Sequence, residues 1–334
     1  MLNDVHLEDE RILVTGGNGV LGVALQKELM RRKISGYRAP ERAVCNLLDF
    51  DAVVKYFDEF RPTVVFHLAG WVAGIGGHMS FAGQSYYENI QINTNVIEAS
   101  RGAGAKKVVA ASSTAVYSDL VQLPMREEDI WNGPPHSSEA SYGHAKRAML
   151  AQLQANEIQY GTRFAYMICT NLYGPNDRFD EKYGHVIPSL VRRFCEAARS
   201  GEKVVKVWGD GSPTRDFLFA QDAASAFLAA AERGSGTYNT ASGTSVSIRQ
   251  IVDIIQSASH FCGDVVWDTS KPNGQLVRSY DIRRINDLNW KPSVDLEEGI
   301  KKTVSWFQEN RKRVRLLRDS ANPELGLPQS LGPA

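Results

Sequence analysis

A glycine-rich turn directly after a buried strand is the feature that most constrains the fold of this chain. The apolar run Ile12-Leu13-Val14 leads into a turn in which Gly16, Gly19 and Gly22 follow the spacing GxxGxxG. A tight strand-to-helix turn, the close passage of a pyrophosphate and the packing of a helix on a strand each need a residue without Cβ. The helix N-terminus then offers free N–H groups and a positive dipole end to phosphate. The motif indicates a dinucleotide site, although glycine-rich turns of this kind are also common elsewhere.

A second motif, Tyr-x-x-x-Lys, is formed by Tyr142 and Lys146. Positions i and i+4 share one face of a helix, so the two side chains are predicted to point into the same cleft. A free phenol has a pKa of about 10, and the Lys146 ammonium is expected to lower that of Tyr142. A hydroxyl from the run Ser112-Ser113-Thr114, at the end of an upstream strand, would share the substrate oxygen. Such a Tyr–Lys pair alone is more often a surface feature, but with the glycine turn and the serine run it predicts an acid–base site.

The composition excludes several classes of partner. Lys and Arg total 38, as do Asp and Glu, so the net charge is zero and neither nucleic acid nor a membrane surface is expected as a partner. The four cysteines are widely spaced, form no CxxC and suggest no metal site. We therefore expect a reducing, cytoplasmic compartment. The N-terminus shows no basic-then-apolar signal, and no apolar run approaches membrane-spanning length.

Strand and helix patterns alternate along the first half of the chain, which predicts a parallel sheet covered on both faces. The fold class is α/β: a Rossmann-type doubly wound parallel sheet with a smaller α/β substrate lobe. Residues 1–172 are expected to form mainly the dinucleotide-binding Rossmann domain, and 173–310 mainly the substrate lobe, with some segments returning to the first domain. Residues 311–334 are expected to be a disordered tail. The predicted strands include 34–38, 63–69, 107–112, 163–169 and 203–208; the predicted helices include 51–60, 89–101, 186–198, 222–233, 248–259 and 296–309.

Longer segments resemble the extended short-chain dehydrogenase/reductase family and, within it, the GDP-fucose synthases. The resemblance covers nearly all residues from about 11 to 310. The glycine turn and Tyr-x-x-x-Lys mark only the superfamily, whereas other segments are more specific. These are His67 to Ile75, Thr170 to Pro175, Gly184 to Pro188, Val207 to Leu218, Lys271 to Gly274 and Leu296 to Ile300.

The resemblance implies a nucleotide-sugar reductase that uses NADP(H) and binds it mainly with residues 1–172. The second strand ends in Arg38 and offers no Asp or Glu there; an acid would favour the NAD ribose hydroxyls, whereas arginine favours a 2′-phosphate. NAD is therefore the less favoured cofactor. The implied cofactor-binding residues are Gly16, Gly19, Val20, Leu21, Gly22, Arg38, Asn46, Leu47, Leu68, Ala69, Gly70, Ala111, Lys146, Cys169, Asn171, Leu172 and His185.

The implied substrate is a GDP-linked 4-keto-6-deoxy sugar, hexose or heptose, whose diphosphate Arg193 and Arg215 would bind. The implied catalytic residues are Ser113, Tyr142, Lys146 and His185. The implied substrate-binding residues are Ser113, Thr114, Asn171, Arg193, Trp208, Arg215 and Lys271. A packed tryptophan and structural ion pairs are the simpler interpretation of Trp208, Arg193 and Arg215 without the resemblance. The family often pairs through helices that include the one carrying Tyr142, so a homodimer is expected.

The chain departs from the fucose-synthase pattern at the epimerase acid. Those enzymes carry a cysteine two residues before the tyrosine of the serine strand, and a histidine later in the chain. Here the tyrosine is Tyr117, the histidine is His185, and the cysteine position is Ala115, whose methyl group cannot move a proton. Counting four back from Tyr117 selects Ser113 as the catalytic hydroxyl. Cys169 stands where many fucose synthases have proline.

These residues predict an NADPH-dependent C4 reductase whose epimerisation at C3 and C5 is weak or absent. Two alternatives stay open at this point. One is a nucleotide-sugar epimerase, either a 4-epimerase that retains bound NAD or an enzyme acting at C3 or C5. The other is a non-catalytic NADP-sensing protein on the same fold, although such proteins often lack the Tyr-x-x-x-Lys motif or the serine. The stereochemistry and carbon count of the sugar, and the nucleotide itself, are not fixed by the sequence.

Overall fold

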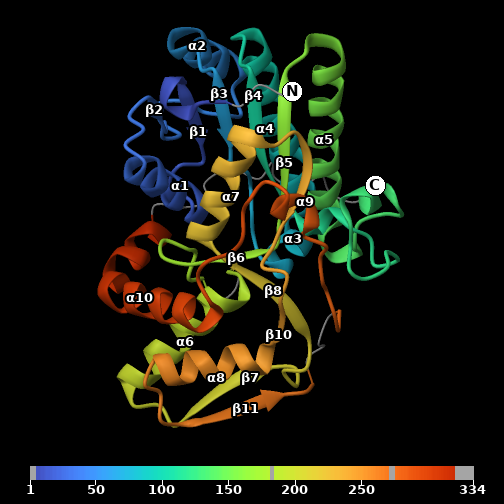
Figure 1. Ribbon diagram of the computed structural model, residues 1–334. Coiled ribbons are helices and arrows are strands. Elements are labelled where there is room, and N and C mark those ends of the chain that lie inside the picture. Colours follow the sequence, from blue (N-terminus) through green and yellow to red (C-terminus); the bar gives the residue numbers. More distant parts are fainter. Residues whose placement is uncertain (1–4, 181–183, 271–274, 320–334) are drawn as a thin grey trace, which may run out of the picture.

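A six-stranded parallel sheet forms the larger part of the molecule (Figure 1). The computed structural model describes residues 5–180, 184–270 and 275–319. The strand order β2-β1-β3-β4-β5-β9 confirms the predicted parallel sheet of the Rossmann type. Its strands are β1 (Ile12–Thr15), β2 (Tyr37–Arg38), β3 (Val64–His67), β4 (Lys107–Ser113), β5 (Arg163–Cys169) and β9 (Gly236–Thr240).

Alternate residues of the central strands enter two different cores, as the two-residue period of a strand requires. In β1, Ile12 and Val14 pack on one face and Leu13 on the other. Helices α1 (Val20–Arg31) and α7 (Ala220–Arg233) cover the first face. Helices α2 (Phe50–Phe60), α4 (Ala82–Gly102) and α5 (Ala140–Tyr160) cover the second. Helices on both faces make the sheet doubly wound, as predicted.

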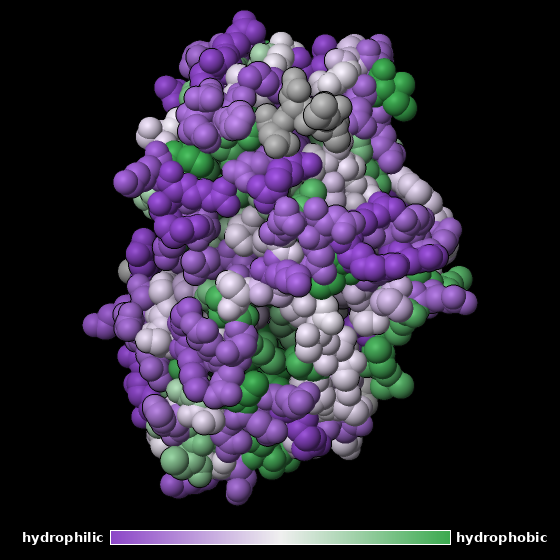
Figure 2. Space-filling model, viewed as in Figure 1, coloured by the Kyte–Doolittle hydropathy of each residue, from purple (hydrophilic) through white to green (hydrophobic). Residues whose placement is uncertain are grey.

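A smaller lobe continues from the carboxyl edge of this sheet and has its own core (Figure 1). Strand β8 (Thr214–Phe219) lies between β6 (Asn171–Tyr173) and β10 (Ser245–Ser247), and β7 (Val204–Trp208) pairs with β11 (Asp264–Asp268). Helices α6 (Val186–Ser200), α8 (Ile248–Ala258) and α10 (Leu296–Asp319) pack on these strands. The chain leaves this lobe in α7 and β9, which return to the large sheet. Figure 2 shows that hydrophilic side chains cover most of the face seen in Figure 1, with hydrophobic ones scattered in its lower half.

Short helical segments complete the described part of the chain. They are η1 (Leu7–Asp9), α3 (Ile75–Ser80), η2 (Thr114–Val116), η3 (Glu127–Trp131), η4 (Ser137–Glu139) and α9 (Arg283–Asn286).

Two elements differ from the sequence-based expectation. The strand predicted over 34–38 pairs with β1 only at Tyr37–Arg38. The last helix continues to Asp319, although a disordered tail was expected from residue 311. Residues 311–319 are mostly Arg, Lys and Leu, which have high helix propensity. Residues 320–334 lie outside the described part.

Candidate active site

The glycine turn between β1 and α1 is shaped as a phosphate cradle. Gly16 has φ +74°, and a Cβ there would lie 2.7 Å from Ala69 N. A Cβ on Gly22 would lie 2.7 Å from Gly17 Cα, so both positions need glycine for the fold itself. At Gly19 a Cβ would make only an ordinary contact, 3.5 Å from Gly16 O. Gly19 is the N-cap of the twelve-residue helix α1 and has no side-chain cap, so the first N–H groups stay open to a phosphate.

The other predicted cofactor residues follow the carboxyl edge of the sheet. The turns after β1 and β3 are tied together, because Leu68 N donates to Thr15 O and Ala69 N to Thr15 Oγ1. Arg38 is exposed at the end of β2, with its guanidinium carbon 4.6 Å from the centre of the Phe60 ring. Asn46 and Leu47 are half-buried beside α4, where Asn95 donates to Leu47 O. A dinucleotide therefore fits this edge, with Arg38 at the end that would hold a 2′-phosphate.

Tyr142 and Lys146 lie together on the buried side of α5, as their spacing predicts. Lys146 Nζ donates to Ala111 O at 2.9 Å and lies 5.7 Å from the centre of the Tyr142 ring. Burial lowers the pKa of Lys146 to about 8, a shift that the neighbouring Cys169 opposes. Burial also raises the pKa of the Cys169 thiol to about 12. Cys169, Asn171 and Leu172 continue the same edge from β5 into β6.

The expected lowering of the Tyr142 pKa is not seen. Burial raises that pKa, and the charges of Cys169, Glu139 and Tyr166 act in the same direction. Tyr142 is 5% exposed, and no compensating influence of Lys146 is resolved at this separation. Sequence could not give this direction, because it shows neither burial nor distance. Tyr142 is held here as a protonated phenol, the form that donates.

The two serines at the end of β4 have different surroundings. Ser112 is buried, and its Oγ donates at 2.6 Å to Tyr166 OH, which donates in turn to Lys146 O. Ser113 is half-buried, and its Oγ accepts from Ala115 N at 3.2 Å. Ser112 thus supports the backbone of α5, whereas the Ser113 hydroxyl keeps its own proton for a further partner. This geometry supports Ser113 as the substrate-orienting hydroxyl, which stays a prediction.

His185 is the N-cap of α6 and makes no side-chain cap bond. Burial lowers its pKa, and Arg178 adds to the effect. The charge of His185 also lowers the pKa of His78 of α3, and the His78 ring stacks on that of Tyr142. The predicted His185 is therefore in the neighbourhood of Tyr142. Sequence analysis did not select His78, because it stands in a glycine-rich segment without a motif.

A pair of arginines lies close to this group. Arg215 of β8 is half-buried, and burial together with the nearby Arg278 lowers its pKa. The charge of Glu139 raises the pKa of both Arg215 and Tyr142, which places the arginine pair near the predicted catalytic residues. The short bridge between Thr214 and Val277 brings Arg278 to Arg215. Sequence analysis predicted Arg215 but missed Arg278, which is 63 residues away and belongs to no recognised motif.

The remaining predicted substrate residues are spread over the smaller lobe. Arg193 Nη1 donates to Lys206 O at 2.7 Å, so its guanidinium lies on β7. Trp208, at the end of β7, is 69% exposed and not a packed core residue. Thr114 is buried beside Ser113, and Asn171 donates to Asp216 O. Lys271 lies outside the described residues.

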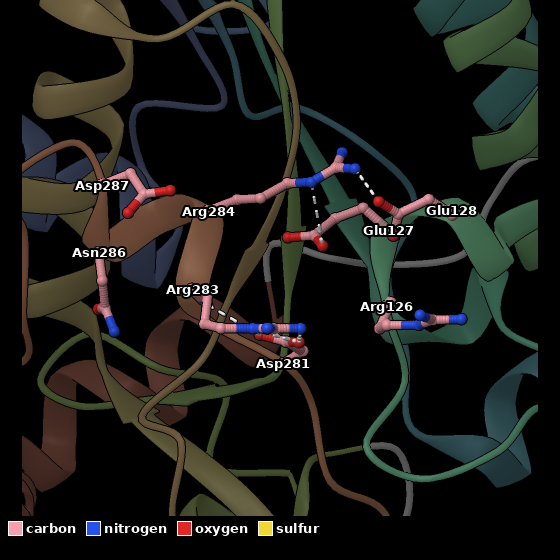
Figure 3. A pocket seen from close by; sticks show the side chains of 8 residues that line it. All are labelled: Arg126, Glu127, Glu128, Asp281, Arg283, Arg284, Asn286 and Asp287. Atoms are coloured by element: carbon pink, nitrogen blue, oxygen red, sulfur yellow. Dashed lines mark hydrogen bonds and ion pairs between the residues drawn. The ribbon is translucent and has the colours of Figure 1, made fainter.

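The charged pocket in Figure 3 is a separate feature. It is lined by residues of η3 and α9 and by residues next to them in the chain. It has a volume of about 450 Å³ and contains none of the predicted site residues. Most of its charged side chains pair with one another, since Arg284 pairs with Glu127 and Glu128, and Arg283 with Asp281. Within the described ranges, no group of three or more metal-ligating side chains is present. In the same ranges, no helix is long and apolar enough to cross a bilayer.

Comparison with known proteins agrees with this arrangement. Residues 12–241 match the model of the NAD dependent epimerase/dehydratase family. The GDP-L-fucose synthase of Escherichia coli (strain K12) is 31% identical over 92% of this chain and its own full length. A GDP-L-fucose synthetase from Naegleria fowleri, solved with NADP, is 31% identical with a TM-score of 0.86, over 93% of this chain and 98% of that one. A GDP-mannoheptose C4 reductase from Campylobacter jejuni, with NADP bound, is 27% identical with a TM-score of 0.82, over 90% and 99%.

Proposed function

The chain belongs to the NAD dependent epimerase/dehydratase family of extended short-chain dehydrogenases/reductases, and we propose that it reduces C4 of a GDP-linked 4-keto-6-deoxy sugar with NADPH. It is an NADP-dependent nucleotide-sugar reductase/epimerase. The proposal adds the reaction at C4, the hexose or heptose substrate, and epimerisation that is weak or absent. Residues 1–172 would mainly bind the cofactor and 173–310 the sugar nucleotide.

One observation supports C4 reduction most directly. The phenol of Tyr142, the ammonium of Lys146 and the Ser113 end of β4 meet at the sheet edge that continues from the glycine cradle. A proton donor, a cation and an orienting hydroxyl beside a dinucleotide site are the groups that ketone reduction needs. The relatives named above include both fucose synthases and a heptose C4 reductase, so the sugar's carbon count stays open.

The roles of the chain's own groups follow from their surroundings. Bound NADPH supplies the hydride that C4 accepts. Tyr142 donates its phenolic proton to the C4 oxygen, and Ser113 holds that oxygen by a hydrogen bond. Lys146, held on Ala111 O, then stabilises the negative charge that remains on the Tyr142 oxygen. Because burial raises the pKa of Tyr142, this stabilisation matters after proton transfer and not before it.

The diphosphate of the substrate is assigned to Arg215 and Arg278. Two guanidinium groups of like charge lie within electrostatic range of each other in a largely buried place. Such an arrangement costs free energy unless an anion is shared between them, and arginine suits bidentate binding of phosphate. Arg193, which the resemblance places on the diphosphate, is held on Lys206 O of β7. With Trp208 it would contact the part of the sugar nucleotide beyond the diphosphate.

Weak epimerisation rests on the side chain at position 115. Inversion beside a ketone needs one group to remove a proton and another to deliver one on the opposite face. His185 is available for one of these steps, but Ala115 is 1% exposed and carries only a methyl group. The nearest hydroxyl along the chain, Thr114, is a weak substitute for an acid with a pKa near working pH.

The decisive experiment incubates the purified protein with NADPH and a panel of GDP-4-keto sugars in D₂O and identifies the products by NMR. Oxidation of NADPH with a new C4 proton and little deuterium at C3 or C5 is the expected result. A copurifying NAD that does not exchange, with interconversion at C4, would identify a 4-epimerase instead. NADPH binding without turnover on any sugar would favour the sensing protein.

We also propose that the protein is a homodimer paired through α5 and the adjacent α4. Both helices carry apolar side chains in solvent: Ile158 is 87% exposed, and Tyr87 of α4 is 63% exposed. Sedimentation velocity of the wild type and of Ile158→Lys tests this assignment. A wild type that sediments as a monomer at all concentrations contradicts it.

A further inference from the structure

The imidazole of His78 covers one face of the Tyr142 ring. The two ring centres are 4.6 Å apart, and the planes are inclined by only 27°. His78 belongs to α3, which packs against η4, the turn that leads into α5 (Figure 1). It is 2% exposed, so water does not reach the stack from that side. A stacked aromatic pair of this kind contributes about 0.5–1.5 kcal/mol beyond the burial of its area.

The imidazole is itself held in place by groups on three sides. Its Nδ1 forms a hydrogen bond of 3.0 Å with Ser85 Oγ of α4, and Ser85 is fully buried. The backbone of Ala73 makes a further hydrogen bond to the ring. The edge of Trp71 meets it at 5.5 Å, with the two planes 72° apart. The ring is therefore anchored independently of Tyr142 and can serve as a fixed wall.

The stacked imidazole is neutral at working pH. Burial lowers the pKa of His78 to about 4, and the nearby His185 contributes to the shift. A neutral imidazole has no acidic imidazolium proton, so His78 does not serve as a general acid near neutral pH. Lys146 is the cation assigned to the phenolate that forms after proton transfer. His78 offers an uncharged ring to the phenol before that transfer.

We propose that His78 is a positioning residue for Tyr142: its neutral ring, anchored to α4 through Ser85, fixes the phenol in the orientation that delivers its proton to the C4 oxygen. The kinetic consequences rest on the proposed reduction. A phenol whose side chain is free to tilt loses the alignment of its oxygen with C4, and a misplacement of about 1 Å costs on the order of 10²-fold in rate. Because the stack does not involve the cradle or the arginine pair, binding of cofactor and of sugar nucleotide should stay intact.

The first arm of the test compares two substitutions in the full-length protein with NADPH and its GDP-4-keto sugar. His78→Ala should lower kcat by about 10- to 100-fold, with KM and the NADPH Kd within about twofold of wild type. His78→Phe keeps a stacked ring and should recover most of kcat. With 4-deuterated NADPH, the isotope effect on kcat should rise in His78→Ala as the chemical step becomes limiting. His144→Ala is the matched control, because His144 is an exposed histidine on α5, the helix that carries Tyr142.

The second arm needs no substrate and therefore separates this proposal from the proposed function. Tyrosines labelled with ¹³C at Cζ are observed by NMR, and the Tyr142 signal is identified by its loss in Tyr142→Phe. His78→Ala should shift that signal, and Ser85→Ala should shift it more weakly while leaving the His78 ring present. If wild type reduces no sugar but the signal responds in this way, the proposed function fails and the positioning role stands.

Two results overturn the inference. One is a His78→Ala protein with wild-type kcat and an unchanged Tyr142 signal. The other is a His78→Phe protein as inactive as His78→Ala, because stacking would then not be what matters. Should His78→Ala fail to fold, Ser85→Ala and His78→Phe still decide: unchanged kcat and an unchanged Tyr142 signal in Ser85→Ala contradict the anchoring.

Discussion

Lys146 and Tyr142 both lie on the buried side of α5, yet the ammonium stands 5.7 Å from the centre of the Tyr142 ring because its hydrogen bond goes to Ala111 O. The carbonyl at the end of β4 thus fixes where the positive charge stands relative to the phenol. Burial keeps the phenol protonated, and the cation is in place for the charge that appears when the proton leaves. A variant that removes only the phenolic oxygen therefore isolates the donor.

Tyr142→Phe keeps the stacked ring and removes the proton donor. Turnover should fall by roughly two to four orders of magnitude, the usual contribution of a positioned acid, while NADPH affinity barely changes. Steady-state kinetics and fluorescence titration measure the two quantities. Tyr160→Phe, at an exposed tyrosine of the same helix, is the control. Near wild-type turnover in Tyr142→Phe would mean that another group donates the proton.

Arg38 should make the protein prefer NADPH to NADH. The discriminating contact is ionic and exposed, so the preference should shrink as salt is raised and largely disappear in Arg38→Ala. Fluorescence titrations of both cofactors at low and high salt test this. Arg283→Ala is a suitable control, because this exposed arginine lies on α9, which packs against β9 at the opposite edge of the sheet. Equal affinities in the wild type would contradict the assignment.

Position 115 should decide how much epimerisation accompanies reduction. In D₂O the wild type should give a product with little deuterium at C3 or C5, because Ala115 moves no proton. Ala115→Cys should raise that deuterium incorporation. Ala115→Ser should not, because serine is close in size to cysteine but has no acidic thiol. Proton and deuterium NMR of the product give the answer. Rapid uptake at both carbons in the wild type would show that another residue does the work of the cysteine.

Asp177 should make stability fall between acid and neutral pH. It is buried, its Oδ2 has no hydrogen-bond partner among the described residues, and burial raises its pKa to about 7 from 3.8. From pH 4 upward the unfolded chain releases a proton that the folded chain keeps, so folding loses free energy until about pH 7. Asp177→Asn cannot ionise, and its advantage over wild type should grow from pH 4 to 7 and then level off, at about 4 kcal/mol or less.

Thermal unfolding of Asp177→Asn and wild type across that range measures the difference in Tm. Asp58→Asn, at an exposed carboxylate, is the matched control. A Tm difference for Asp177→Asn that stays constant with pH would show that Asp177 does not hold its proton in the folded chain.

The glycine turn and the Tyr142 helix were predictable because their signals are local. Gly16, Gly19 and Gly22 fall within one turn, and Tyr142 and Lys146 within one helical turn, so spacing alone orders them. The buried strands could be predicted for the same reason, as in Val64–His67, whose apolar run is continuous. The family model and the relatives agree with the family and the fold predicted from these signals.

Other parts depend on contacts distant in sequence. Strand β10, three residues long, pairs with β8 some thirty residues earlier, and no local pattern marks so short a strand. His78 meets Tyr142 across 64 residues, and Arg278 meets Arg215 across 63, neither within a recognisable motif. The direction of the Tyr142 pKa shift needed burial, which a sequence does not display. Helix α3 was missed because its glycines argue against a helix.

The return of α7 to the large sheet has a consequence for how such enzymes diversify. Ala223, Phe227 and their neighbours complete the core on one face of that sheet, although they follow strands of the smaller lobe. A chain cut near residue 172 would leave this face covered by α1 without α7, so neither lobe is a module that can be exchanged whole between relatives. We therefore expect new activities on this frame to arise by substitutions within it, of the kind proposed for Ala115.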